Sequence, residues 1–115
     1  MKLAERCDAV EECYEFMLAY AAQGLGTEGG EIRGYLGRAA AALSDIGAAC
    51  AAERVTSAFT AVVELDAESS LAAIEMVVGQ GVISSQLIDN LNASIHLRAL
   101  LTDLFLIDEI LKLRG

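Results

Sequence analysis

Two stretches of the sequence repeat apolar residues at the same spacing, on either side of a glycine-rich segment. In both, the steps between successive apolar residues are four, three, four, three and four positions. The first stretch has Leu3, Cys7, Val10, Tyr14, Met17 and Ala21, and the second has Ile32, Leu36, Ala39, Leu43, Ile46 and Cys50. This spacing keeps one stripe of an α-helix directed toward one partner. The sequence therefore predicts amphipathic helices at about residues 2–23 and 28–52, which pair as an antiparallel hairpin.

The composition also predicts an all-α fold. The chain has 115 residues and no proline, and 55% of its residues are hydrophobic. Because proline is the strongest helix breaker, glycine is left as the main residue that can interrupt a helix here. A chain of this length can bury one core. We therefore expect a single helical-bundle domain, residues 1–115, with four to five antiparallel helices.

The second half of the chain predicts further helical segments. Residues 53–81 carry two short apolar stripes that are out of phase with each other, which predicts a break or kink near Asp66–Ser70. Aspartate and serine side chains favour such a break because they compete for backbone hydrogen bonds. A long helix is expected at residues 85–113, with Ser84 or Ser85 as its N-cap.

The helix expected at residues 85–113 is apolar on two sides. Its two stripes are Leu97, Leu100, Leu104, Ile107 and Leu111, and Leu87, Leu91, Ile95, Leu101 and Phe105. A helix that is apolar on two faces has to be covered on both, and one bundle of this size leaves one of them at the surface. The second stripe therefore predicts a homo-oligomer, most simply a two-fold dimer that completes the bundle.

Arg98 is expected to lie among the residues of this second stripe. A guanidinium in an apolar setting needs a partner. One interpretation is an ion pair with Asp66, with Glu75 or with an acid of a second copy. The other is a bidentate anchor for a carboxylate or phosphate of a ligand.

The charge of the chain limits its partners. The formal net charge is −9 at pH 7, and a negative surface repels nucleic acids and anionic membranes. Charged residues begin at Lys2 and Glu5, a pattern that does not fit a signal peptide. The most apolar later stretch, residues 97–111, carries several charges and is too short to span a bilayer. We expect a cytoplasmic protein that binds neither nucleic acid nor membrane.

Cysteines and tyrosines are assigned to the core or its edge. The odd number of cysteines and the lack of a CxxC pair predict buried thiols rather than a disulfide or a metal site. These cysteines are Cys7, Cys13 and Cys50. The tyrosines Tyr14, Tyr20 and Tyr35 are expected to pack at the edge of the core, with their hydroxyls in water.

Carboxylates near the start of the chain are the candidate metal site. Glu12 and Glu15, with Asp8 and Glu11 beside them, recur at helical spacing, and such pairs bind Mg²⁺ or Mn²⁺ in several all-helical enzymes. The second acidic pair that all-helical nucleotide pyrophosphohydrolases use is missing in a helical context. The pattern is therefore typical of a solvated acidic face, and the single histidine, His96, is expected to be exposed as well.

Three kinds of function remain open from the sequence. The leading hypothesis is a non-enzymatic protein that acts through protein contacts as a homo-oligomer, in the role of an adaptor, a regulator or an accessory subunit. It follows from the lack of an evident catalytic set and from the surplus of apolar surface. The second is a bundle that holds a small apolar ligand or cofactor in space left between bulky residues such as Phe59, Met76 and Phe105. The third is a metal-dependent all-α hydrolase that uses the carboxylates of residues 2–23.

Overall fold

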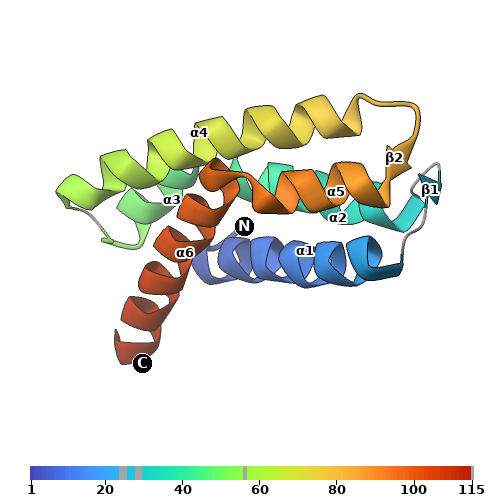
Figure 1. Ribbon diagram of the computed structural model, residues 1–115. Coiled ribbons are helices and arrows are strands. Elements are labelled where there is room, and N and C mark those ends of the chain that lie inside the picture. Colours follow the sequence, from blue (N-terminus) through green and yellow to red (C-terminus); the bar gives the residue numbers. More distant parts are fainter. Residues whose placement is uncertain (24–25, 28–29, 56, 115) are drawn as a thin grey trace.

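The computed structural model describes residues 1–23, 26–27, 30–55 and 57–114. These residues form six α-helices and two short strands (Figure 1), which confirms the all-α fold class but gives more helices than the four to five predicted. In chain order the elements are α1 (Leu3–Gln23), β1 (Gly26–Thr27), α2 (Gly30–Leu43), α3 (Ile46–Ala52), α4 (Ala58–Val78), β2 (Ile83–Ser84), α5 (Ser85–Ala93) and α6 (Ile95–Arg114).

The core is built on α1 and α2, which lie side by side and run in opposite directions (Figure 1). The apolar stripe predicted for residues 28–52 is buried along its whole length, from Ile32 to Cys50. In α1 the buried positions drift from the prediction, because Cys13 and Tyr20 are buried whereas Tyr14 and Ala21 are only half-buried. A straight helix with 3.6 residues per turn drifts in this way against a strict seven-residue repeat.

The helix predicted at residues 28–52 is interrupted, which corrects the expectation of one continuous element. Asp45 has a left-handed backbone (φ 56°, ψ 31°) and separates α2 from α3. Aspartate tolerates this conformation better than most residues. Arg6 stabilises the break by donating hydrogen bonds to the carbonyls of Ala42, at 2.9 Å, and Ser44. The predicted start of this helix at Glu28 lies outside the described residues.

The break predicted near Asp66–Ser70 is wrong, because α4 is continuous over 21 residues. Its start is fixed by a capping box, in which the Ser57 hydroxyl accepts from the Phe59 amide and the Thr60 hydroxyl accepts from the Ser57 amide. The Ser70 hydroxyl does not compete for the backbone of α4. It is buried and donates to the carbonyl of His96, 3.0 Å away.

The helix predicted at residues 85–113 is two helices, α5 and α6, separated at Ser94 by an extended ψ of 128°. The prediction of an N-cap at Ser84 is confirmed, since its hydroxyl accepts from the Leu87 amide at 3.1 Å. Beyond the break, α6 crosses the other helices and its C-terminal half points away from them (Figure 1).

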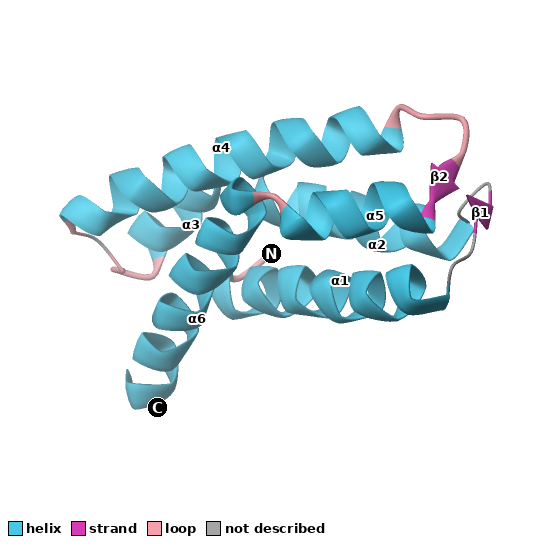
Figure 2. Cartoon of the chain, viewed as in Figure 1, coloured by secondary structure: helices cyan, strands magenta, loops and turns pink. Residues whose placement is uncertain are grey.

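The connection between α1 and α2 meets the connection between α4 and α5 at one end of the molecule. The strands β1 and β2 pair antiparallel, with Gly26 opposite Ser84 and Thr27 opposite Ile83 (Figure 2). This pairing ties the connection between α1 and α2 to the connection between α4 and α5. None of the described helices is both long and apolar enough to cross a membrane.

Candidate protein-interaction surfaces

Arginine side chains hold the ends of three helices by binding backbone carbonyls. Each comes from a different element and binds carbonyls that would otherwise lack a partner at a helix C-terminus. The bonds run from Arg6 to Ala42 and Ser44 at the end of α2, from Arg33 to Val78, Gln80 and Gly81 at the end of α4, and from Arg114 to Glu53 and Arg54 at the end of α3. Between described residues, the ion pairs are those of Lys112 with Asp108 and Glu109, on α6. Most carboxylates of the described residues are thus not neutralised by a direct ion pair.

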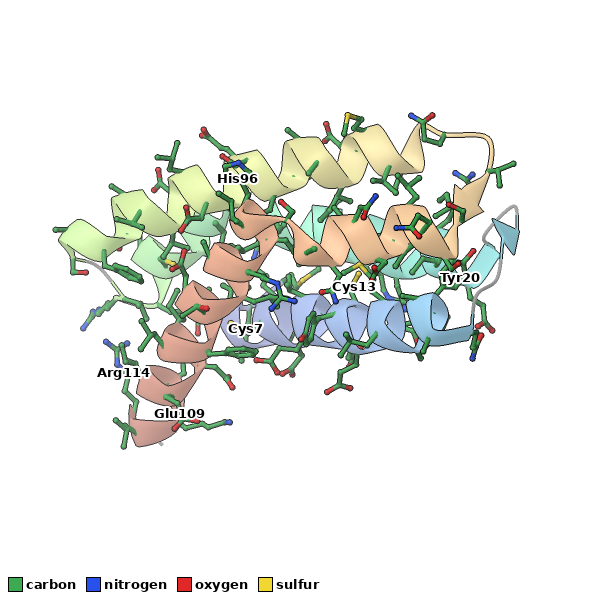
Figure 3. All side chains as sticks on the ribbon, in the orientation of Figure 1. Cys7, Cys13, Tyr20, His96, Glu109 and Arg114 are labelled. Carbon is green, nitrogen blue, oxygen red and sulfur yellow. The ribbon has the colours of Figure 1, made fainter. Side chains whose placement is uncertain are left out.

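The face of α4 that points away from the other helices carries an apolar stripe. Its inner stripe of Val63, Ala67, Ser70, Ile74 and Val77 is buried. On the opposite side, six residues recur at steps of four, three, four, three and four positions. They are Ala58, Val62, Leu65, Ser69, Ala72 and Met76, here named the α4 outer stripe. Leu65 is 63% exposed and Met76 is 67% exposed, and Figure 3 shows side chains of α4 projecting away from the other helices.

The charges on α4 are all negative. Glu64, Glu68 and Glu75 are exposed along one flank of the α4 outer stripe, and the helix contains no lysine, arginine or histidine. Glu64 also lies over Gly47 of α3, where an added Cβ would collide with its carboxylate. This flank borders an open hollow of about 360 Å³ between α4 and the break that separates α2 from α3. Asp45, Glu64 and Glu68 contribute the acidic groups of its lining.

The α4 outer stripe is the feature that the sequence reasoning missed. The two short stripes predicted for residues 53–81 were Val55, Phe59 and Val62, and Leu71, Ile74 and Val78, so only Val62 of the α4 outer stripe belonged to either of them. The break expected between them concealed one stripe that extends along a continuous helix. A test for a second stripe at the same spacing over residues 58–76 would have found it.

The outer face of α6 is the second exposed apolar surface. It consists of Ile95, Leu106, Ile110 and Leu113, here named the α6 outer face. Ile95 is 75% exposed and Leu113 is 86% exposed. Charges of both signs lie on the same exposed side of the helix, at Arg98, Glu109 and Lys112. Glu109 and Arg114 mark this end of the molecule in Figure 3.

The predicted interface stripe on residues 85–113 is divided by the break at Ser94. Leu91 and Leu101 are buried in the core of the monomer, and Leu87 is half-buried against it. Ile95 and Phe105 are exposed. The five residues do not share one face, and only Ile95 and Phe105 are exposed to a partner.

Arg98 is not buried within the chain. Its side chain is exposed, on the same side of the helix as the α6 outer face. In the described part of the chain it makes no ion pair with Asp66 or Glu75. The guanidinium is thus accessible at the start of α6.

A pair of carboxyl groups lies where α4 meets α6. Asp103 is only 6% exposed, and its Oδ2 atom has no hydrogen-bond partner among the described residues. Burial, which is the largest cause, together with a hydrogen bond to Asp66 and charge repulsion from Asp66, raises the pKa of Asp103 from 3.8 to about 7. Asp103 therefore holds a proton well above the pH at which an ordinary aspartate loses it.

The cysteines are buried thiols, as predicted. Cys7, Cys13 and Cys50 are free and buried, and Figure 3 shows the first two on α1. Burial is the largest cause that raises the pKa of Cys7 and that of Cys13 to about 12. A thiol with so high a pKa carries almost no reactive thiolate at neutral pH.

The tyrosines are only partly as expected. Tyr20 is buried, and its hydroxyl donates to the carbonyl of Ile83 at 2.6 Å instead of reaching water. This bond joins α1 to β2. Tyr35 is half-buried and stacks on Phe16, with ring centres 4.2 Å apart, while the Arg38 guanidinium lies 4.5 Å from the centre of the Tyr35 ring.

The sites considered for a metal or an apolar ligand lie mostly on the surface. Glu12 and Glu15 are exposed on α1, and the described residues contain no group of three or more His, Cys, Asp or Glu side chains placed to hold a metal ion. Phe59, Met76 and Phe105 are exposed rather than gathered around a cavity. An apolar space within the core, lined by Val10, Cys13, Tyr14, Met17, Leu36, Ala39, Ile74, Leu97 and Leu101, measures about 10 Å³. This is no larger than one water molecule needs.

His96 is exposed as predicted, at the start of α6 (Figure 3).

In comparisons with known proteins, no family model, no curated protein and no solved structure matches this chain.

Proposed function

We propose that this protein acts through protein–protein contacts as a homodimer, in the role of an adaptor, a regulator or an accessory subunit. The observation that carries the proposal is the α6 outer face, whose apolar residues are exposed. The C-terminal half of α6 points away from the other helices (Figure 1). Exposed apolar surface of this kind is typical of an interaction site.

The charges of α6 support self-association rather than binding to a strongly charged partner. In an antiparallel pair of α6 helices, Ile95 of one copy would face the partner's Leu113, and Arg98 would face the partner's Glu109. Such a two-fold interface contacts the same patch on both copies, so every attractive contact occurs twice. Opposite charges at these positions favour the antiparallel register.

Sedimentation velocity of the whole protein tests this proposal. We expect a dimer at micromolar concentration. Leu106→Glu should weaken the dimer at least about tenfold, because about 1.4 kcal/mol is enough for that change. Leu106 is exposed in the monomer, so the variant should still fold.

Leu65→Glu is the matched control, since Leu65 is equally apolar and exposed but lies on α4. It should leave the dimer unchanged. A wild-type protein that stays monomeric, or a dimer that the substitution at Leu106 does not weaken, would contradict the proposal.

A further inference from the structure

The α4 outer stripe is long and regular enough to receive another helix. It extends over residues 58–76, which corresponds to about 27 Å along a helix axis. The alternating steps of four and three positions are those at which two helices pack along a shared seam. In the described structure no other element covers this face, and the large side chains on it are exposed.

The α4 outer stripe contains both large and small residues. Val62, Leu65 and Met76 are large, whereas Ala58, Ser69 and Ala72 are small. Small residues let a second backbone approach closely, and large ones fill the grooves of the approaching helix. Methionine adapts its shape to different partners. This surface therefore suits the apolar face of an amphipathic helix.

Charge decides which helix fits. The flank formed by Glu64, Glu68 and Glu75 is acidic, and α4 has no cation to balance it. An antiparallel two-fold pairing of two α4 helices would place this flank against its own copy, because a two-fold interface joins identical patches. Like charges across an interface oppose binding. A second copy is thus disfavoured on α4, in contrast to the mixed charges of α6.

The hollow beside this flank offers room for a cation. It measures about 360 Å³ and is lined by Asp45, Glu64 and Glu68. Gly47, which has no side chain, leaves space for the Glu64 carboxylate at its edge. An arginine or lysine that extends from a helix lying on α4 would reach these carboxylates.

We propose that the α4 outer stripe binds a basic amphipathic helix of another protein, with a cationic side chain of that helix in the acidic hollow. The surface is separate from the dimer interface proposed on α6, so one molecule could pair with its copy and bind this partner at the same time.

Binding of a synthetic peptide to the whole protein, measured by isothermal titration calorimetry, tests the proposal. The peptide should be as long as α4, 21 residues, with leucine and alanine at alternating four and three spacing and with lysine and arginine on the flanks. A second peptide with the same apolar residues and glutamate on the flanks is the control. We expect one basic peptide to bind per chain, more weakly as salt is added, and the acidic peptide to bind at least tenfold more weakly.

Variants of the protein locate the binding site. Leu65→Glu, and separately the double substitution Glu64→Gln with Glu68→Gln, should each weaken binding of the basic peptide at least tenfold. Leu113→Glu on α6 should leave it unchanged. All of these side chains are exposed, and circular dichroism melting curves will check that each variant is folded.

Three results would overturn the proposal. The first is a basic peptide that does not bind to the folded protein. The second is equal binding of the basic and acidic peptides, which would assign no role to the carboxylates. The third is a Leu65→Glu variant that loses the dimer in sedimentation velocity, which would mean that a second copy covers α4.

Discussion

Arg33 shows at the level of one residue how this acidic chain uses its cations. Its guanidinium donates to the carbonyls of Val78, Gln80 and Gly81, at 2.8, 2.6 and 3.2 Å. Hydrogen bonds to a charged group contribute more than neutral ones, about 1.5–3 kcal/mol. We therefore expect Arg33→Ala to lower the free energy of unfolding by roughly 2 kcal/mol, measured by urea denaturation.

Arg38→Ala is the matched control for this change. The Arg38 guanidinium lies over the ring of Tyr35 on the exposed side of α2. A contact of this kind contributes about 0.5–1 kcal/mol at an exposed site. If the two substitutions destabilise the protein equally, the carbonyl bonds of Arg33 do not hold the end of α4.

Asp103 gives the stability of the fold a dependence on pH. Its pKa is raised from 3.8 to about 7 in the folded chain, so between these values the folded chain holds a proton that the unfolded chain has lost. The stability that this proton contributes is complete below the unfolded pKa and is lost as pH rises through the folded pKa. We expect the free energy of unfolding to fall between about pH 4 and pH 7.

Asp103→Asn tests this expectation, because an amide keeps the size of the side chain and cannot ionise. Urea denaturation across this pH range should show a flatter profile for the variant, and higher stability than the wild type at pH 8. A wild-type profile that rises from pH 4 to pH 7 and is unchanged by the substitution would show that Asp103 ionises normally.

At the scale of elements, the stability of α4 depends on the N-cap at its first turn. The Ser57 hydroxyl accepts from the Phe59 amide at 3.1 Å, and no acidic residue assists it in the first turn. Loss of such a cap costs about 1 kcal/mol. Ser57→Ala should therefore lower the midpoint of thermal unfolding by several degrees. Ser69→Ala, at a half-buried position in the middle of the same helix, should leave the midpoint unchanged or raise it, because alanine has the higher helix propensity.

The sequence predicts which stripes are buried better than where helices end. Burial follows the 3.6-residue period of a helix, so the burial of the stripe from Ile32 to Cys50 could be predicted directly from the spacing of its apolar residues. It remains in register through the break at Asp45, and the pattern therefore does not reveal that break. Tertiary contacts decide these positions, as with Arg6 at the end of α2 and with Ser70, whose hydroxyl binds α6 instead of breaking α4.

The candidate surfaces were harder to predict because they depend on the whole molecule. The surplus of apolar residues in the C-terminal part of the chain was visible in the sequence. Its location was not, because the break at Ser94 places Leu91 and Leu101 in the core and leaves Ile95 exposed. On α4, an inner and an outer stripe can be told apart only when the helix is known to be continuous.

The two exposed apolar surfaces of the molecule differ in charge, and we propose a different partner for each on this ground. The exposed charges of α6 have both signs, whereas α4 has only carboxylates. In the proposed antiparallel dimer, Arg98 faces the partner's Glu109 twice. Reversing one of these charges, as Arg98→Glu or as Glu109→Arg, should place like charges in contact at two symmetric positions. Each single variant should dimerise several-fold more weakly in sedimentation velocity, since exposed pairs contribute about 0.2–1 kcal/mol each.

The double variant, Arg98→Glu with Glu109→Arg, restores opposite charges in the reversed order. It should recover most of the dimer affinity of the wild type, and added salt should reduce the differences among the four proteins because it screens exposed charges. Recovery of this kind requires that the two residues meet across the interface. If the double variant is weaker than either single variant, Arg98 and Glu109 do not meet across the interface, and the α6 helices do not pair in this antiparallel register.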